Sequence, residues 1–275
     1  MTNNLHSKKT EEKERSTIRG LGCALTTLTA FPWPGKECKD LSDSLPWFPI
    51  IGLLIGLILY AIGRTWNLLS FMQWPEGAAL VMVLAAIWAT RGLHLDGLAD
   101  WADSAGGLLD REARLAIMKD VRVGAFGILA LIVDFAAKWL ALTRLISSES
   151  LIWIFAVFML SRGMMVELIT TLPYAGTGEG MAKPFVAGAS QRRRISAHLL
   201  SFAFCLLYGP LGAALSGLAG VIVWLFKRYC RNRYGGITGD LLGTANEMVE
   251  IGLLMVCALP GNAILKYTGW TWILS

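Results

Sequence analysis

The sequence predicts an all-α membrane protein whose single domain, residues 1–275, crosses the bilayer about seven times. Hydrophobic residues make up 55% of the chain and charged residues only 16%, whereas soluble domains carry about 25% charged residues. Two segments, 44–63 and 195–226, hold no Lys, Arg, Asp or Glu over at least 20 residues, the length that crosses a bilayer. A very apolar soluble core is the less favoured alternative, because soluble helices seldom stay uncharged over such lengths.

The predicted spans follow the weakly charged stretches in order along the chain. Residues 195–226 contain no Lys, Arg, Asp or Glu for 32 residues, which at 1.5 Å per residue is too long for one span. Gly209 and Pro210 supply a break, so we expect two helices joined by a tight turn there. The other expected spans are 44–63, 77–90, 123–146, 151–170 and 251–265.

The connections between these spans fall into two sets that differ in charge. The long, polar set holds 20 of the 25 Lys and Arg residues and comprises 1–43, 91–122, 171–194 and 227–250. The short set contains Arg64 as its one basic residue. Seven spans place the sets on opposite faces, so the positive-inside rule puts the N-terminus and the long loops in the cytoplasm. The net charge of +5 then faces anionic lipid, and no array of aromatic and basic residues predicts a nucleic-acid partner.

Residues 1–43 form a polar N-terminal segment without the features of a secretory signal peptide. Its residues 18–34 are weakly amphipathic and end in "FPWP", so they could lie in the membrane interface or form a plain loop. The five cysteines are scattered without a Cys-x-x-Cys pair. This spacing predicts neither a zinc site nor a disulfide framework.

Three aspartates follow the second predicted span, in the sequence "HLDGLADWADSAGG". Asp96, Asp100 and Asp103 are spaced i, i+4 and i+7, so on a helix they share one face. Carboxylates this close repel each other unless a cation neutralises them. Hard oxygen ligands suit Mg²⁺, which also takes phosphate oxygens. The alternative is a solvated helix start, which does not explain why the like charges share one face. The preceding His94 is a candidate base or ligand, although a single histidine is more often a hydrogen-bonded structural residue.

A second acidic segment, "GGITGDLLGTANEMVE", covers residues 235–250 on the same predicted membrane face. Its Asp240 and Glu247 are seven residues apart and share one helical face. The glycines that open the segment allow the backbone to approach a phosphate. We therefore expect a two-part site for a metal and a diphosphate. The expected metal ligands are Asp96, Asp100, Asp103, Asp240 and Glu247, and the expected phosphate contacts in this segment are Gly235, Gly236 and Thr238.

Basic residues suited to a diphosphate lie in neighbouring segments. "IMKDVRVGAFG" supplies Lys119 and Arg122, which would bind phosphate or serve as positive-inside anchors. Arg162 lies in the cytoplasmic half of a predicted span and could reach the same site. Asp134 and Lys138 are spaced i, i+4 in another span and could form a buried pair. The third loop, which carries "LPYAGTGEG", is a candidate lid.

Together these motifs resemble those of the cobalamin synthase family, the adenosylcobinamide-GDP ribazoletransferases. "GLHLDGLADWADSAGG" is similar to that family's signature. "IMKDVRVGAFG", "LPYAGTGEG" and "GGITGDLLGTANEMVE" are similar to its later blocks, in the same order. "TLTAFPWP" and "PWFPIIGLLIG" resemble its N-terminal blocks. Two residues depart from the pattern, because Trp101 stands where Thr is expected and Arg91 where a small residue is usual.

The resemblance implies a multi-pass enzyme of the bacterial inner membrane that needs Mg²⁺ and has its active site facing the cytoplasm. It would join adenosylcobinamide-GDP to α-ribazole or its 5′-phosphate, release GMP and close the nucleotide loop of cobalamin. Other enzymes of cobalamin assembly are potential partners. By motif position, the acidic residues above would hold the metal, one aspartate or His94 would act as base, and Lys119 and Arg122 would hold the diphosphate. Trp101 and Tyr174 are candidates to line a corrinoid pocket.

Two other classes of protein remain as alternatives. A CDP-alcohol phosphotransferase of phospholipid synthesis also carries an Asp-Gly stretch with later aspartates, but here Asp100 stands where that class expects Arg. A cation-dependent membrane transporter would place the acids in mid-membrane on broken helices, often with internal repeats. The sequence places them at span ends and shows no repeat.

Overall fold

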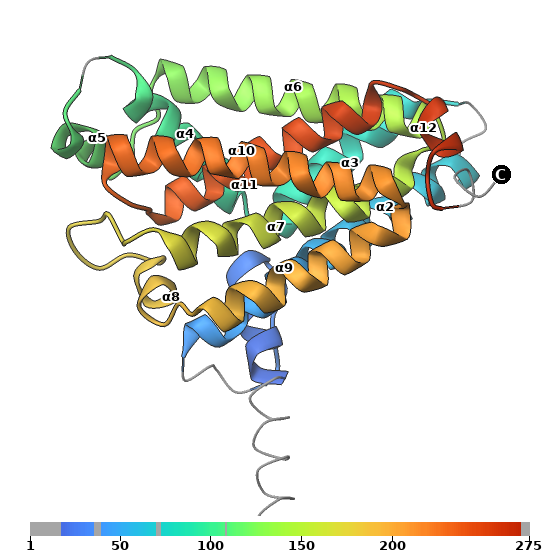
Figure 1. Cartoon of the computed structure of the whole chain (residues 1–275). Helices are drawn as coiled ribbons and strands as arrows, with labels where there is room; N and C mark the ends of the chain where they lie inside the picture. The colour runs from blue at the N-terminus through green and yellow to red at the C-terminus, as the bar shows by residue number, and fades with distance from the viewer. Residues whose placement is uncertain (1–17, 36–39, 70–72, 108, 271–275) are drawn as a thin grey trace, which may run out of the picture.

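Helices form all the regular secondary structure of residues 18–35, 40–69, 73–107 and 109–270, which the computed structural model describes. Most of the long helices run side by side along one direction (Figure 1). The first described segment is a short apolar helix, Ile18–Leu28. It is followed by η1 (Leu41–Trp47), α2 (Phe48–Leu69), α3 (Pro75–Ala89), α4 (Leu93–Ala105), α5 (Arg111–Ile117), α6 (Ala125–Ser147), η2 (Leu151–Trp153), α7 (Ile154–Thr171), α8 (Lys183–Ala187), α9 (Gln191–Cys205), η3 (Leu206–Tyr208), α10 (Pro210–Tyr234), α11 (Gly239–Ala258) and α12 (Ala263–Lys266).

Helix α7 forms the centre of the bundle. It is mostly apolar, and 14 of its 18 residues are buried, as expected for a helix enclosed by others. Helices α2, α9, α10 and α11 pack around it. Helices α6 and α10 are buried on one side only and leave the other side apolar and exposed, as a lipid-facing helix requires.

The predicted spans agree with the helices over most of the chain. The stretches at 44–63, 123–146 and 151–170 correspond to α2, α6 and α7, and the predicted break is confirmed because α10 begins at Pro210. In the part of the chain that the structure describes, five helices are long and apolar enough to cross a membrane, or six if α3 and α4, bent by 89°, form one span. The fifth predicted span, the first half of 195–226, corresponds to α9, which has only 15 residues.

The prediction for the last span was wrong. Helix α11 begins at Gly239, twelve residues before the predicted start at Ile251, so most of the predicted loop 227–250 is helical. Only the four residues from Gly235 to Thr238 separate α10 from α11. The polar residues of this segment do not mark a loop, because Asn246, Glu247 and Glu250 are buried against other helices.

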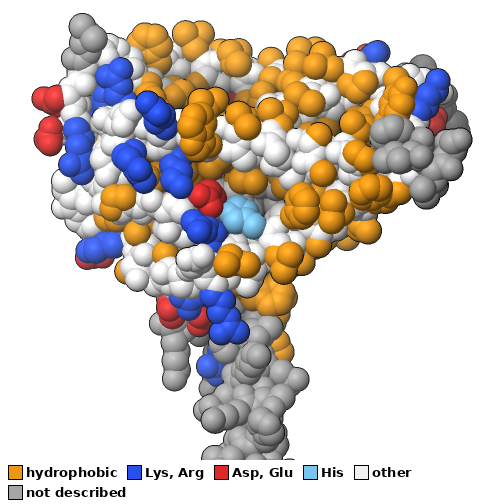
Figure 2. All heavy atoms as spheres, viewed as in Figure 1, with side chains coloured by type: hydrophobic (Ala, Val, Ile, Leu, Met, Phe, Trp, Pro, Cys, Tyr) orange, Lys and Arg blue, Asp and Glu red, His pale blue; other side chains and the backbone are white. Residues whose placement is uncertain are grey.

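Connections from the two predicted sets lie at opposite ends of the bundle (Figure 1). Helices α5 and α8 and the turn between α10 and α11 lie at one end, and α12 lies at the other. Lys and Arg side chains gather near the first end on the face shown in Figure 2, while hydrophobic side chains cover the middle. In the N-terminal segment 1–43, the helix Ile18–Leu28 contributes Ala24 and Leu28 to the core, and residues 1–17 and 36–39 lie outside the described residues.

Candidate active site between α4 and α11

Helices α4 and α11 cross closely because each presents a glycine to the other's backbone. A Cβ atom on Gly97 would lie 2.5 Å from the carbonyl oxygen of Asp240, and one on Gly243 would lie 3.0 Å from the Cα of His94. The Oγ1 of Thr244 donates a hydrogen bond to the Gly97 carbonyl, at 3.0 Å. Small residues at such a crossing let helix backbones approach. The crossing thereby joins the two acidic segments predicted from the sequence.

Four aspartates meet at this crossing. Asp96, Asp100 and Asp103 lie on α4, which confirms the predicted helix, and Asp240 lies in the first turn of α11. Among these neighbours, Asp240 repels the negative charge of Asp100 most strongly, followed by Asp96 and Asp103. Within the described ranges none of the four has an ion pair with Lys or Arg. The cluster therefore brings four carboxyl groups together without a neutralising Lys or Arg among the described residues.

Carboxylate oxygens in this number have the chemistry that a divalent cation such as Mg²⁺ prefers. Among residues 18–35, 40–69, 73–107 and 109–270, however, no group of three or more Asp, Glu, His or Cys side chains is arranged to hold a metal ion. One reason is that both carboxylate oxygens of Asp103 are already hydrogen-bonded to backbone groups. Its two carboxylate oxygens accept hydrogen bonds from the backbone N–H groups of Gly124 (2.6 Å) and Gly127 (2.8 Å), at the start of α6. Asp103 thus caps α6.

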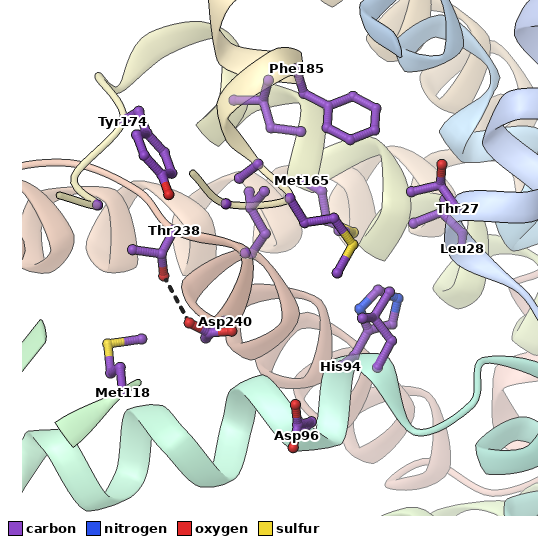
Figure 3. A pocket seen from close by; sticks show the side chains of 18 of the residues that line it. Thr27, Leu28, His94, Asp96, Met118, Met165, Tyr174, Phe185, Thr238 and Asp240 are labelled. Atoms are coloured by element: carbon purple, nitrogen blue, oxygen red, sulfur yellow. Dashed lines mark hydrogen bonds between the residues drawn. The ribbon is translucent and has the colours of Figure 1, made fainter. Parts of the chain in front are cut away.

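A cavity of about 240 Å³ opens beside the acid cluster. Asp96 and Asp240 form its acidic side, and Thr238 lies next to Asp240 with their side-chain oxygens 3.4 Å apart (Figure 3). His94 lies on the other, apolar side. The apolar wall includes Leu28, Phe48, Leu115, Met118, Met165, Ile169, Tyr174 and Phe185.

The two predicted phosphate-binding cations differ in position. Lys119 is exposed at the cavity, and its Nζ donates a hydrogen bond to Thr177 Oγ1, at 2.9 Å. It therefore links the segment before α6 to the predicted lid. Arg122 is 85% exposed and pairs with Asp120 at 2.6 Å. The hydrogen bonds from Arg122 lower the pKa of Asp120 to about 2. Arg122 does not line the cavity.

The predicted glycine contacts to phosphate have structural explanations instead. Gly235 has a φ of +73° and ends α10, a left-handed conformation that glycine adopts readily. Gly236 lies against the Pro173 carbonyl, where a Cβ would clash. The Ile237 N–H donates to this carbonyl, at 2.9 Å. Thr238 caps α11 by accepting a hydrogen bond from the Leu241 N–H. Of the three phosphate contacts predicted in this segment, Thr238 is the one that lines the cavity.

A second charged group, which we call the buried charge cluster, lies deeper in the bundle. It consists of Asp134 and Lys138 on α6, Arg162 on α7, and Glu247 and Glu250 on α11, each at most 8% exposed. Lys138 pairs with Asp134 (3.3 Å), as predicted, and also with Glu247 and with Glu250 (3.1 Å). Arg162 pairs with Glu250.

These pairs give two predicted site residues other partners. Glu247 pairs with Lys138 and Arg162 with Glu250 inside the bundle, so their roles as metal ligand and phosphate contact stay predictions. The sequence reasoning missed Glu250. The signal for Glu250 in the sequence was its i, i+3 spacing from Glu247 within an apolar stretch, where buried acids need cationic partners.

The two residues predicted to line a corrinoid pocket differ in position. Trp101 packs against Phe226 and Tyr229 of α10, each with ring centroids 6.2 Å apart. It does not line the cavity, whereas Tyr174 does.

Comparison with known proteins identifies the family. Residues 20–258 match the cobalamin-5-phosphate synthase family. The chain belongs to this family. A relative from Chlorobium chlorochromatii, named adenosylcobinamide-GDP ribazoletransferase, is 42% identical over 88% of this chain and 96% of its own length. Relatives with the same name from Chlorobaculum tepidum and Syntrophobacter fumaroxidans are 42% and 38% identical, over 88% and 86% of this chain and 96% and 97% of their own lengths. No solved structure matches.

Membership of the cobalamin-5-phosphate synthase family confirms the resemblance predicted from the four internal motifs, all of which lie within the matched residues. It leaves the phospholipid-synthesis and transporter alternatives without support. The match also includes the crossing of α4 and α11, so the acid cluster belongs to the part of the chain that defines the family.

Proposed function

We propose that this protein is an adenosylcobinamide-GDP ribazoletransferase, which joins adenosylcobinamide-GDP to α-ribazole or α-ribazole 5′-phosphate with release of GMP. The observation that carries the proposal is the cluster of unpaired aspartates beside the cavity. Displacement at a phosphorus of a diphosphate depends on positioning and on neutralising charge. Such a site needs acidic groups to hold a cation, and a neighbouring space for the second substrate.

In this mechanism a ribose hydroxyl of ribazole attacks the phosphorus that is linked to the corrinoid. The new P–O bond forms as the bond to the bridging oxygen of GMP breaks, and the hydroxyl proton passes to a carboxylate. Asp96 and Asp240 are the carboxylates on the cavity wall, so we assign the base to one of them. Lys119 is the cation at the cavity and is suited to hold a phosphate oxygen.

For the metal we propose two ligands, Asp100 and whichever of Asp96 and Asp240 does not act as base. Phosphate oxygens of the substrate would supply further ligands. The donor chemistry fits Mg²⁺, which rarely relies on protein ligands alone. Bound there, Mg²⁺ would neutralise the charge of the diphosphate and of the departing GMP. Asp103 holds the start of α6, which fixes α6 against the ligand-bearing helix α4.

We further propose that the site faces the cytoplasm of a bacterial cell across its inner membrane, with the N-terminus on the same side. The basic residues gathered near the α5 end of the bundle support this orientation by the positive-inside rule. Association with other enzymes of cobalamin assembly would account for the membrane location. Cysteine labelling of a Val121→Cys variant from the periplasmic side would contradict the orientation, since Val121 is fully exposed in the segment before α6.

The test uses purified full-length protein in lipid nanodiscs, supplied with adenosylcobinamide-GDP, α-ribazole and Mg²⁺. We expect a cobalamin product and one GMP for each, both lost on chelation with EDTA. Asp240→Asn should abolish both products while the protein remains membrane-inserted. Asp120→Asn is the matched control, since this exposed aspartate pairs with Arg122 outside the cluster. Full turnover by Asp240→Asn, or no cobalamin product from the unmodified protein, would overturn the proposal.

A further inference from the structure

The cavity beside the acid cluster has two chemically different sides. Asp96 and Asp240 lie on one side, and the opposite wall is built from apolar side chains of five separate segments, among them Leu28, Met165 and Phe185. These three are at most 4% exposed, so the wall is preformed. A ligand that fits both sides has a flat apolar part and a polar part that reaches the aspartates.

The size of the cavity limits what its apolar side accepts. A buried apolar cavity of about 150 Å³ holds one benzene ring, so 240 Å³ suits a bicyclic aromatic ring and is far too small for a corrin macrocycle. Guanine is also a poor occupant, since it carries several donors and acceptors that an apolar wall would leave unpaired. The benzimidazole base of ribazole is bicyclic and has a single ring nitrogen free to form a hydrogen bond.

His94 supplies one polar atom for such a base. Its ring is 2% exposed and lines the cavity, and Figure 3 shows it on the side of Met165 and Leu28. Its Nε2 is buried without a hydrogen-bond partner. A buried ring nitrogen without a partner is unfavourable, and a bound ligand removes this penalty. The side chain can donate or accept, depending on its tautomer.

We propose that this cavity binds the benzimidazole base of ribazole, with His94 Nε2 hydrogen-bonded to the free ring nitrogen of the base. The assignment rests on the proposed function and adds to it the position of one substrate. With the base beside His94, the attached ribose extends toward Asp96 and Asp240, where its hydroxyl meets the carboxylates. The corrinoid and the guanosine then lie outside the cavity, on the cytoplasmic side of the acid cluster.

The first experiment fills the cavity and measures ribazole binding without turnover. Equilibrium dialysis of α-ribazole against the protein in nanodiscs should give a saturable site in the absence of any corrinoid. Met165→Trp should weaken this binding at least tenfold and raise KM for α-ribazole, while KM for adenosylcobinamide-GDP stays within twofold. Met164→Trp is the matched control, because Met164 is the neighbouring buried methionine on α7 and does not line the cavity.

The second experiment tests the hydrogen bond with a substrate analogue. The α-riboside of 5,6-dimethylindole carries a C–H group in place of the free ring nitrogen. The unmodified protein should prefer α-ribazole over this analogue by about tenfold in Kd, the effect of one buried hydrogen bond. His94→Ala should bind both ligands about equally, because the partner that distinguishes them is gone. A purely structural role for His94 would weaken both ligands and leave their ratio unchanged.

The outcomes separate this inference from the proposed function. Two outcomes would overturn the proposed binding site for the base but leave the proposed transferase function in place. One is unchanged turnover of α-ribazole by Met165→Trp. The other is a preference for α-ribazole over the indole analogue that persists in His94→Ala. Saturable α-ribazole binding without any GMP release would overturn the transferase and keep the base site. A rise in KM for the corrinoid substrate alone in Met165→Trp would assign the cavity to that substrate and refute the proposal.

Discussion

The buried charge cluster predicts a large loss of stability when one of its two cations is removed. The Nζ atom of Lys138 contacts three carboxylates, and the side chain is only 9% exposed. Lys138→Met keeps most of the side-chain volume but leaves the three carboxylates with Arg162 as the one cation of the buried charge cluster, and Arg162 pairs with Glu250. Removing one partner of a buried ion pair costs about 3–5 kcal/mol. At about 2–4 °C per kcal/mol, the melting temperature should fall by about 10 °C.

The assay is thermal unfolding of the purified protein in nanodiscs, followed by intrinsic tryptophan fluorescence. The double variant Lys138→Met, Glu247→Gln should recover at least half of the loss, since it removes a negative charge together with the positive one. Lys227→Met is the control. Lys227 pairs with Glu167 at 3.0 Å but is 23% exposed, so about 1 kcal/mol or less is expected. A melting temperature of Lys138→Met equal to that of the control, or no recovery in the double variant, would refute the reasoning.

Three further predictions concern the site. Gly97→Ala should lower turnover at least tenfold, because its Cβ would lie 2.5 Å from the backbone of α11. Gly217→Ala is the control and should leave turnover unchanged, since nothing lies within 4 Å of its Cβ. Equal turnover by the two variants would disprove the close crossing of α4 and α11. Lys119→Ala should raise KM for adenosylcobinamide-GDP about tenfold, whereas Arg122→Ala should change this KM less than twofold. A larger rise in KM for Arg122→Ala than for Lys119→Ala would assign phosphate binding to Arg122. Asp103→Ala should destabilise the protein by about 2 kcal/mol in the same unfolding assay, through loss of the cap of α6, and an unchanged melting temperature would contradict that role.

The sequence predicted the parts of this structure that follow from local patterns. The spacing of Asp96, Asp100 and Asp103 placed them on one helical face, which α4 confirms. The break at Gly209 and Pro210 was also correct, because glycine and proline act on the backbone next to them. Apolar, weakly charged stretches located α2, α6 and α7 for a similar reason, since the bilayer selects each span by its own composition.

What the sequence reasoning missed depends on contacts between distant segments. Glu247 and Glu250 resembled loop residues because their partners, Lys138 and Arg162, are about 90 to 110 residues away in the chain. The partners make these acids tolerable inside an apolar helix, and the helix therefore begins earlier than hydropathy suggests. Gly236 resembled a phosphate contact because the reason for a glycine, the Pro173 carbonyl, is visible only in the fold.

The distribution of the buried charges also has a consequence for how the chain enters the membrane. Lys138 has an acid one turn away on its own helix, so α6 can enter lipid as an internally paired segment. Arg162 has its acidic partner, Glu250, on α11, which is synthesised almost ninety residues later. A lone arginine at the centre of a span costs about 2.5–3.5 kcal/mol on insertion. Until α11 is made, Arg162 on α7 lacks the carboxylate that neutralises it in the folded protein, so α7 carries this cost through most of the synthesis of the chain.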